Sequence, residues 1–357
     1  MKRSINAARF WVQLVLTGGF LVLLAWRVGD IGEALATLPE ATWLWVLPGL
    51  ILFTISKALH TARWRIFLGS HRNVPYSGLL GIFLVHNMAN AVLLLRAGDV
   101  LRIQTTAQRY GIPRSEVAAT VVVVETLLDG FAFVVLVAIA FSLGEVTGVL
   151  QGTFWGMAGL ALVGLGLGVV TARWLKADVV ERIYPFLWLS HDVRASIRVI
   201  LGQFIDGLRT LRESRLVVPA VILSLAGWLL EASAYWLFGL AFGLELNFGA
   251  YLLIMMTANF AVSIPLTPSG IGPYEVATQE LIVFLGEERA LAAGFAIGIH
   301  LCFILWITFT GLTAMWLMRL KPAEVFYLAP SEEQEPHPQP GAPCSSPPWN
   351  GSDAGGK

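Results

Sequence analysis

The chain has 357 residues, of which 56% are hydrophobic and only 13% are charged, about half the charged share of an ordinary soluble domain. A soluble core of this size cannot bury so much apolar surface, so the composition excludes a soluble globular protein and predicts an all-α polytopic membrane protein. The 24 basic and 24 acidic residues balance, so net charge gives no reason to expect a nucleic-acid partner.

Long apolar runs predict the membrane spans. A helix needs about 20 apolar residues to cross a bilayer, because backbone amides in lipid must be paired within the segment. Six runs meet this standard, approximately Phe10 to Trp26, Trp43 to Ala62, Val117 to Phe141, Leu150 to Thr171, Leu216 to Phe242 and Ala290 to Leu317. We therefore expect about six full spans.

Two further apolar runs are interrupted by polar or helix-breaking residues. They are Ser77 to Leu95, which contains His86, Asn87 and Asn90, and Phe248 to Leu285, which contains Pro265, Pro268, Gly270, Gly272 and Pro273. If both segments enter the membrane and return on the same side, nearly all lysines and arginines fall on one side, which the positive-inside rule identifies as the cytoplasm. We expect re-entrant hairpins or pairs of half-helices, with both chain ends cytoplasmic.

The order of these segments predicts an internal repeat. Span, span, broken segment and span follow each other in residues 10–141 and again in 150–317. Three spans in each half place the halves upside down relative to one another, as in inverted-repeat transporters. Six spans with two ordinary helices are the alternative. Residues 1–320 would form one membrane domain, with an amphipathic cytoplasmic linker at 173–215 and a disordered tail at 329–357.

Three acidic residues lie within predicted spans. Glu125 and Asp129 share one helix face, about 12 and 18 Å along the helix from Val117, and Glu231 is similarly deep in the fifth span. An ionisable group inside a membrane is costly and faces protein or water. These carboxylates are therefore candidates for a proton site or a site for a cationic part of a substrate. The alternative is a buried ion pair that holds helices together.

A basic cluster follows the first broken segment. Arg96 and Arg102 flank Gly98 and Asp99, and we expect Gly98 to form a tight turn between the charged groups. The planar guanidinium fork of arginine suits a phosphate, so a lipid phosphate at the cytoplasmic mouth is the favoured ligand. The alternative is an arginine that only reaches the interface, which is also the expectation for Arg63 and Arg65.

The second broken segment contains a half-helix start. Pro268, Gly270 and Gly272 would end one half-helix and Pro273 would begin the next, with Glu275 in its first turn. Free amides at such a start bind anionic groups in transporters. A simple helix break with an acidic first turn is the alternative.

Enzyme and cofactor motifs are lacking from the sequence. The chain has no Walker A sequence, no His-Glu-x-x-His, no Gly-x-Ser-x-Gly and no dinucleotide-binding turn, so we expect neither an enzyme nor a cofactor. His60, His86 and His300 are scattered without metal-ligand spacing, and the two cysteines have no disulfide or zinc pattern.

Three stretches resemble a known family. They are LLLRAGDVLRIQTTAQRYGIP at Leu93 to Pro113, VVVVETLLDG at Val121 to Gly130 and IPLTPSGIGPYE at Ile264 to Glu275. In order and spacing they resemble the flippase-like membrane domain shared by the lysylphosphatidylglycerol synthase transmembrane region and YbhN-type proteins. The sequence departs from the family pattern at Asp99, where Glu is usual, at Thr126, where Arg is usual, and at Ser269, where Gly is usual.

The resemblance implies that the protein moves a lipid or a lipid-linked headgroup between the leaflets of a cell inner (plasma) membrane. Only a short tail follows the membrane part, so the resemblance does not imply the lysyl-transfer reaction of the synthases. We expect Arg96 and Arg102 to engage the phosphate of a phospholipid or polyprenyl-phosphate-linked substrate, while Glu125, Asp129 and Glu231 provide a polar path. A non-transporting scaffold subunit of a lipid or polysaccharide synthesis complex is the alternative. A homo-oligomer and a partner enzyme both stay open.

Overall fold

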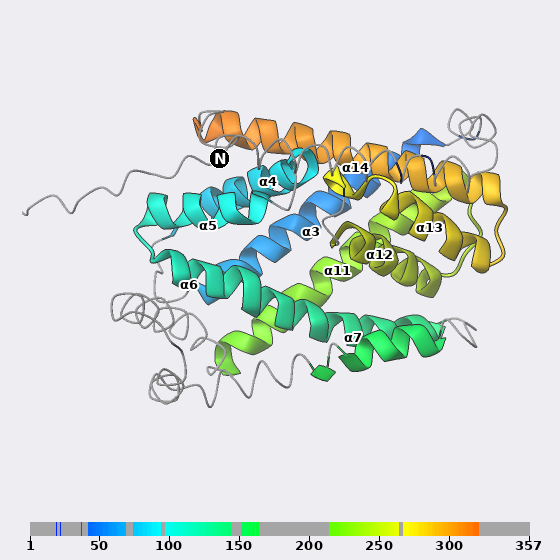
Figure 1. The fold of residues 1–357 in the computed structure, drawn as a ribbon, viewed down its shortest axis with the longest axis horizontal. Helices are drawn as coiled ribbons and strands as arrows, with labels where there is room; N and C mark the ends of the chain where they lie inside the picture. Colours follow the sequence, from blue (N-terminus) through cyan, green and yellow to red (C-terminus); the bar gives the residue numbers. More distant parts are fainter. Residues whose placement is uncertain are drawn as a thin grey trace, which may run out of the picture.

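The computed structural model describes residues 42–68, 74–93, 97–143, 151–160, 162–163, 214–263 and 267–320, together with Gly19, Val22 and Thr37. Within these ranges the regular structure is helical and contains no strand (Figure 1). The all-α fold class is therefore confirmed. The linker 173–215, except its last two residues, and the tail 329–357 lie outside the described ranges.

In the part of the chain that the structure describes, three helices are long and apolar enough to cross a membrane. They are the segment Trp43–Phe67, which comprises η1 (Trp43–Trp45) and α3 (Val46–Phe67), the segment Arg215–Phe242 of α11 (Ser214–Phe242), and α14 (Arg289–Leu317). These match three of the six expected spans. The expected first span lies almost wholly outside the described ranges, and the fourth is described only in part, as helix at 151–160 and 162–163.

The expected span from Val117 to Phe141 is a continuous helical run with a change of winding. It comprises α6 (Arg114–Ala118), the π-helical segment η3 (Ala119–Val124) and α7 (Glu125–Leu143). The wider π turn falls directly before Glu125, which begins α7. Such turns inside helices are frequent at functional sites.

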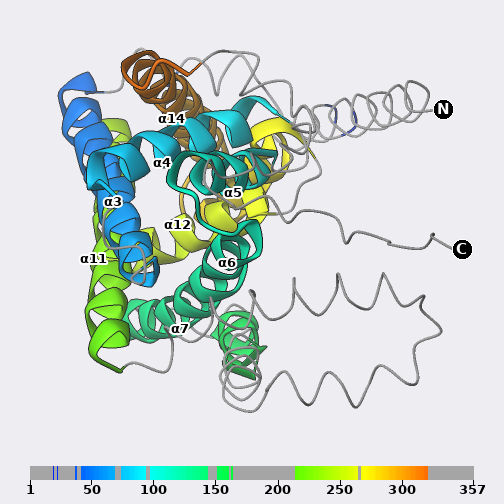
Figure 2. The ribbon, with the colours of Figure 1, turned by 90° about the vertical axis from the view of Figure 1, so that its left-hand side faces the viewer.

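The central pair of helices, α3 and α11, runs antiparallel. The amide of Thr42, before α3, donates to the carbonyl of Ala241 near the end of α11 at 2.7 Å. Small residues allow the close approach: a Cβ on Gly49 would lie 2.9 Å from the Phe238 ring, and one on Gly227 would lie 3.0 Å from the His60 ring. Figure 2 shows the two helices side by side. This tight contact fixes their register.

The first broken segment is a helical hairpin whose limits differ from those expected. Residues 77–95 do not contain the whole hairpin: α4 (Tyr76–Val92) is its first arm, and α5 (Ala97–Tyr110) is its second. Gly98 does not form the expected tight turn, because it lies in α5, where a Cβ would come 2.3 Å from the backbone oxygen of His86 in α4. Glycine is thus needed for the contact between the two arms.

The second broken segment agrees with the expectation. It comprises α12 (Phe248–Ser263), the short η6 (Pro268–Gly270) and α13 (Pro273–Phe284). Gly270 and Gly272 have φ angles of 77° and 97°, which residues with a side chain rarely adopt. Pro273 occupies the first turn of α13 and the Glu275 carboxylate caps the helix by accepting from the Gly272 amide at 2.6 Å.

The two halves exchange packing partners. The α4 arm of the first hairpin packs against α14 in the second half, while the α12 arm of the second packs against α7 in the first. The largest buried apolar cluster joins both halves and includes Phe53, Phe238 and Phe295. A smaller buried cluster, which includes Trp64 and Ile82, lies within the first half.

We expect Gly98→Ala to loosen the α4–α5 hairpin, because the added methyl group overlaps a backbone oxygen. Overpacking of this kind costs about 1–3 kcal/mol, and should lower the thermal unfolding midpoint of the purified protein in detergent. Gly152→Ala is the matched control, since a Cβ there meets no heavy atom of the described residues within 4 Å. A Gly98→Ala midpoint equal to that of the control would contradict the close contact.

Candidate functional site

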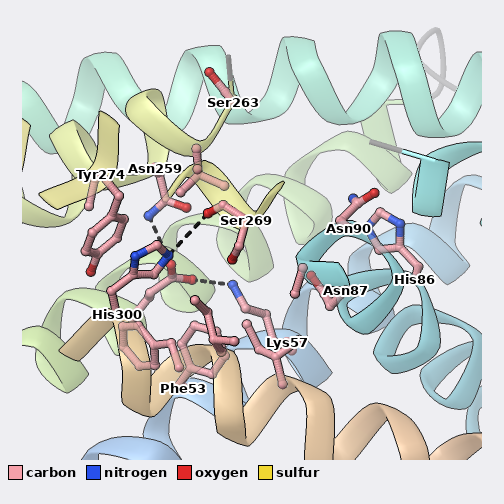
Figure 3. A pocket seen from close by; sticks show the side chains of 18 of the residues that line it. Phe53, Lys57, His86, Asn87, Asn90, Asn259, Ser263, Ser269, Tyr274 and His300 are labelled. Atoms are coloured by element: carbon pink, nitrogen blue, oxygen red, sulfur yellow. Dashed lines mark hydrogen bonds and ion pairs between the residues drawn. The ribbon is translucent and has the colours of Figure 1, made fainter. Parts of the chain in front are cut away.

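A cavity of about 220 Å³ lies where the two broken segments approach each other. Its walls come from α3, α4, α11, α12, α14 and the turn between α12 and α13. Figure 3 shows Asn87 and Asn90 on one side of it, with Ser269 and His300 on the other. Phe53, Phe303 and Ile307 supply apolar wall. Both halves of the chain therefore build one polar site.

A buried ion pair crosses from α3 to α11 at the cavity wall. The Lys57 ammonium lies 2.7 Å from Oε2 of Glu231. The Asn259 amide of α12 donates to the other carboxylate oxygen at 3.0 Å, and the Ser56 hydroxyl lies 3.4 Å from Oε2. Glu231 is thus a buried carboxylate of α11 whose partners lie on two other helices, α3 and α12.

The turn between α12 and α13 is attached to α14 through His300. Its Nδ1 lies 2.6 Å from Oε1 of Glu275, and its Nε2 lies 3.2 Å from the carbonyl oxygen of Ser269. Tyr274 stacks on the same imidazole with ring centroids 3.9 Å apart, and its hydroxyl lies 3.0 Å from that of Tyr235. Glu275 therefore stabilises the loop, and its carboxylate is already engaged on both oxygens.

The α4 side of the cavity is held by the Gly98–Asp99 motif. Oδ1 of Asn90 accepts from the Gly98 amide at 2.8 Å, and the Asn90 amide nitrogen lies 3.4 Å from the Asp99 carboxylate. That carboxylate also lies 3.4 Å from Nδ1 of His86. Gly98 and Asp99 thus orient two cavity-lining side chains.

Arg102 is not among the residues that line the cavity, and its terminal guanidinium nitrogens are held by protein groups. Its guanidinium donates to both Glu125 oxygens at 2.6 and 2.9 Å. It is sandwiched between the Trp64 and Phe83 rings, at 3.8 and 4.6 Å from their centroids, and is 1% exposed. The expected position of Arg102 at an open cytoplasmic mouth is therefore wrong: it ties α5 to the start of α7.

Asp129 has its own arginine. Arg63 forms an ion pair with it, and Trp228 and Ser224 of α11 contact the same carboxylate oxygen at 2.9 and 3.3 Å. Arg63 is 2% exposed, so its expected role as an interface anchor is wrong. Glu125 and Asp129 share a helix yet bind different arginines, as in the ion-pair alternative.

The predicted site residues therefore separate into groups. Glu231 and Gly270 line the cavity, while Pro268, Gly272 and Glu275 shape the adjoining turn. Arg102, Glu125 and Asp129 form ion pairs outside the cavity lining, and Arg96 lies outside the described residues.

Several lining residues were missed, notably Lys57, Asn87, Asn90, Asn259 and His300. Their signal was a polar side chain inside an apolar run, which for Asn87 and Asn90 was read only as an interruption of the run and not as part of a site. No group of His, Cys, Asp or Glu in the described ranges is arranged to hold a metal ion.

Comparison with known proteins places this geometry in a family context. The family model described as "Lysylphosphatidylglycerol synthase TM region" matches residues 10–311. A Haloferax volcanii protein named "Glycosyltransferase AglD" is 27% identical over 78% of this chain and 49% of its own length. A UPF0104 membrane protein of Pyrococcus horikoshii is 25% identical over 78% of this chain and 88% of its own length. The chain spans about half the length of the haloarchaeal relative. No solved structure matches.

We expect Arg102→Met to destabilise the fold strongly, because it leaves the Glu125 carboxylate without its cation inside the protein. Breaking a buried pair costs about 3–5 kcal/mol, whereas the double variant Arg102→Met with Glu125→Leu should recover much of the loss. Thermal unfolding of the purified variants in detergent measures both. If Arg102→Met alone is as stable as the wild type, the Arg102–Glu125 pair does not hold α5 and α7 together.

Proposed function

The chain belongs to the family of the lysylphosphatidylglycerol synthase transmembrane region, and on that premise we propose that it is a lipid translocase. It moves a phosphate-bearing lipid, or a lipid-linked headgroup, between the leaflets of the cell inner membrane. The observation that carries the proposal is the polar cavity built jointly by both broken segments.

The cavity has the chemistry that a lipid headgroup needs. Lys57 offers a cation for a phosphate oxygen, and Asn87, Asn90 and Asn259 offer amide donors and acceptors. At about 220 Å³ the space suits a headgroup rather than a whole lipid, so the acyl chains would remain in the bilayer. Polar groups inside a membrane that line a cavity rather than face lipid mark a substrate path.

The arrangement of the halves supports alternating access. In inverted-repeat transporters, discontinuous helices from both repeats meet around the substrate near the bilayer midplane. Here α3 in the first half and α11 in the second half run antiparallel. The hairpin arms also exchange partners between halves, α4 with α14 and α12 with α7. Rocking of one half against the other would open the cavity to each leaflet in turn.

A second candidate function is a non-transporting membrane subunit that holds a lipid-modifying or glycan-synthesising enzyme. The name of the longer Haloferax volcanii relative, a glycosyltransferase, favours it, because the present chain matches about half of that protein. In that function, the ion pairs of Lys57, Arg63 and Arg102 would hold the helices rigidly together. Copurification of a partner enzyme with a protein that moves no lipid would support this function.

The test of translocation uses purified protein in liposomes that carry fluorescent phosphatidylglycerol or a fluorescent polyprenyl-phosphate analogue. Wild-type protein should equilibrate at least one of these lipids between leaflets. Lys57→Gln should slow this by about ten- to a hundredfold, because it removes a charge-assisted hydrogen bond to the phosphate. Dithionite quenching of the outer leaflet follows the rate.

Arg289→Gln is the matched control, because it makes a similar cation-to-amide change at the protein surface. The Arg289 side chain is 40% exposed and pairs with Glu280. It should scramble lipid at the wild-type rate. If folded wild-type protein moves neither lipid, the translocase proposal fails. If Lys57→Gln and the control are equally fast, the cavity is not the path.

A further inference from the structure

The ion pair in the cavity lies where an anionic ligand would compete with Glu231 for Lys57. Among the described residues that line the cavity, Lys57 and Glu231 are the only lysine, arginine, aspartate or glutamate. They neutralise each other at 2.7 Å. An anionic headgroup that enters this space therefore meets a single cation, and that cation already has a partner.

The two members of the pair are held unequally. Glu231 is 2% exposed and keeps the Asn259 amide on one oxygen and the Ser56 hydroxyl near the other, independently of Lys57. Lys57 is 13% exposed, and its ammonium lies 4.3 Å from the centre of the Phe53 ring. The lysine is thus the member that can move toward a ligand while the carboxylate stays in place.

Moving Lys57 onto a phosphate leaves Glu231 as a buried charge without a counter-ion, which costs several kcal/mol in a low-dielectric site. Uptake of one proton removes that charge. We infer that an anionic phosphodiester headgroup displaces Glu231 from Lys57 and that Glu231 takes up a proton from water as it does so. The cavity then stays electrically neutral: one O–H bond forms on the carboxylate as the bond between that proton and its donor, hydronium or a buffer acid, breaks.

The neighbouring ionisable groups leave Glu231 as the proton acceptor. His300 of α14 is engaged by Glu275 at 2.6 Å, and His86 of α4 lies 3.4 Å from Asp99. Tyr235 on α11 and Tyr274 on α13 are hydrogen-bonded to each other at 3.0 Å, and phenols carry no charge near neutral pH. On α12, the group that faces Glu231 is the uncharged Asn259.

The consequence is proton-coupled handling of an anionic lipid. This inference rests on the proposed function, because it specifies the charge of the substrate and the ion that accompanies it. By linkage, binding that takes up one proton tightens by about tenfold for each unit that the pH falls, over the range in which free Glu231 is ionised. A zwitterionic headgroup would satisfy both members of the pair and needs no proton.

The experiment measures binding of dioctanoyl phosphatidylglycerol, a short-chain anionic phosphodiester, to the full chain in detergent. Isothermal calorimetry in two buffers of different ionisation enthalpy counts the protons taken up. We expect about one proton per lipid and a Kd that falls about tenfold per unit of decreasing pH. Glu231→Gln, whose amide cannot take up the proton, should abolish both effects. Glu280→Gln, at the surface pair with Arg289, should retain both.

The outcomes separate this inference from the translocase proposal. Binding without proton uptake in the wild type overturns the counter-ion exchange and leaves translocation standing if the liposomes scramble lipid. Proton uptake that persists in Glu231→Gln overturns the assignment to this carboxylate. No binding at any pH by folded protein also overturns the inference, while the liposome assay decides translocation on its own.

Discussion

A charge inside the membrane must find its counter-charge on another helix, and this constraint organises the described fold. Lys57 on α3 pairs with Glu231 on α11, and Arg63, six residues later on α3, pairs with Asp129 on α7. Arg102 on α5 pairs with Glu125 at the start of α7. Each pair fixes the register of two helices, because a shift by one residue would leave both charges uncompensated. The cavity exists between helices positioned in this way.

The sequence predicted the helical membrane fold and the break after α12, and it singled out Glu125, Asp129 and Glu231. It could not predict their partners, because the pairs join residues up to 174 positions apart and local periodicity carries no information about such contacts. Lys57 illustrates the same limit, because local pattern gives no sign of its partner Glu231. The positive-inside rule treats a lysine as a marker of topology, whereas a lysine with a buried carboxylate opposite it is stable within a helix.

The motifs that carry the family resemblance support the site more often than they line it. Gly98 allows α5 to approach α4, Asp99 contacts His86 and Asn90, and Glu275 caps α13 while it contacts His300. Irregular backbone is tolerated at membrane depth only where protein or a cavity satisfies its polar groups. The turn from Thr267 to Gly272 meets this condition through its own hydrogen bonds and through His300. Such supporting residues constrain the shape of the cavity but leave its ligand to the lining side chains.

The π-helical turn Ala119–Val124 sets the angle between two contacts on the same helical run. On its N-terminal side, the Thr120 hydroxyl accepts from the Trp64 indole at 3.2 Å, and on its C-terminal side Glu125 binds Arg102. A π turn holds one residue more than an ordinary α turn, and each residue rotates a helix by about 100°. Loss of a single residue in this segment would therefore turn Glu125 away from Arg102 or Thr120 away from Trp64. Alignments of relatives should accordingly tolerate substitutions here more readily than length changes, even though the last four residues of the segment are all valine.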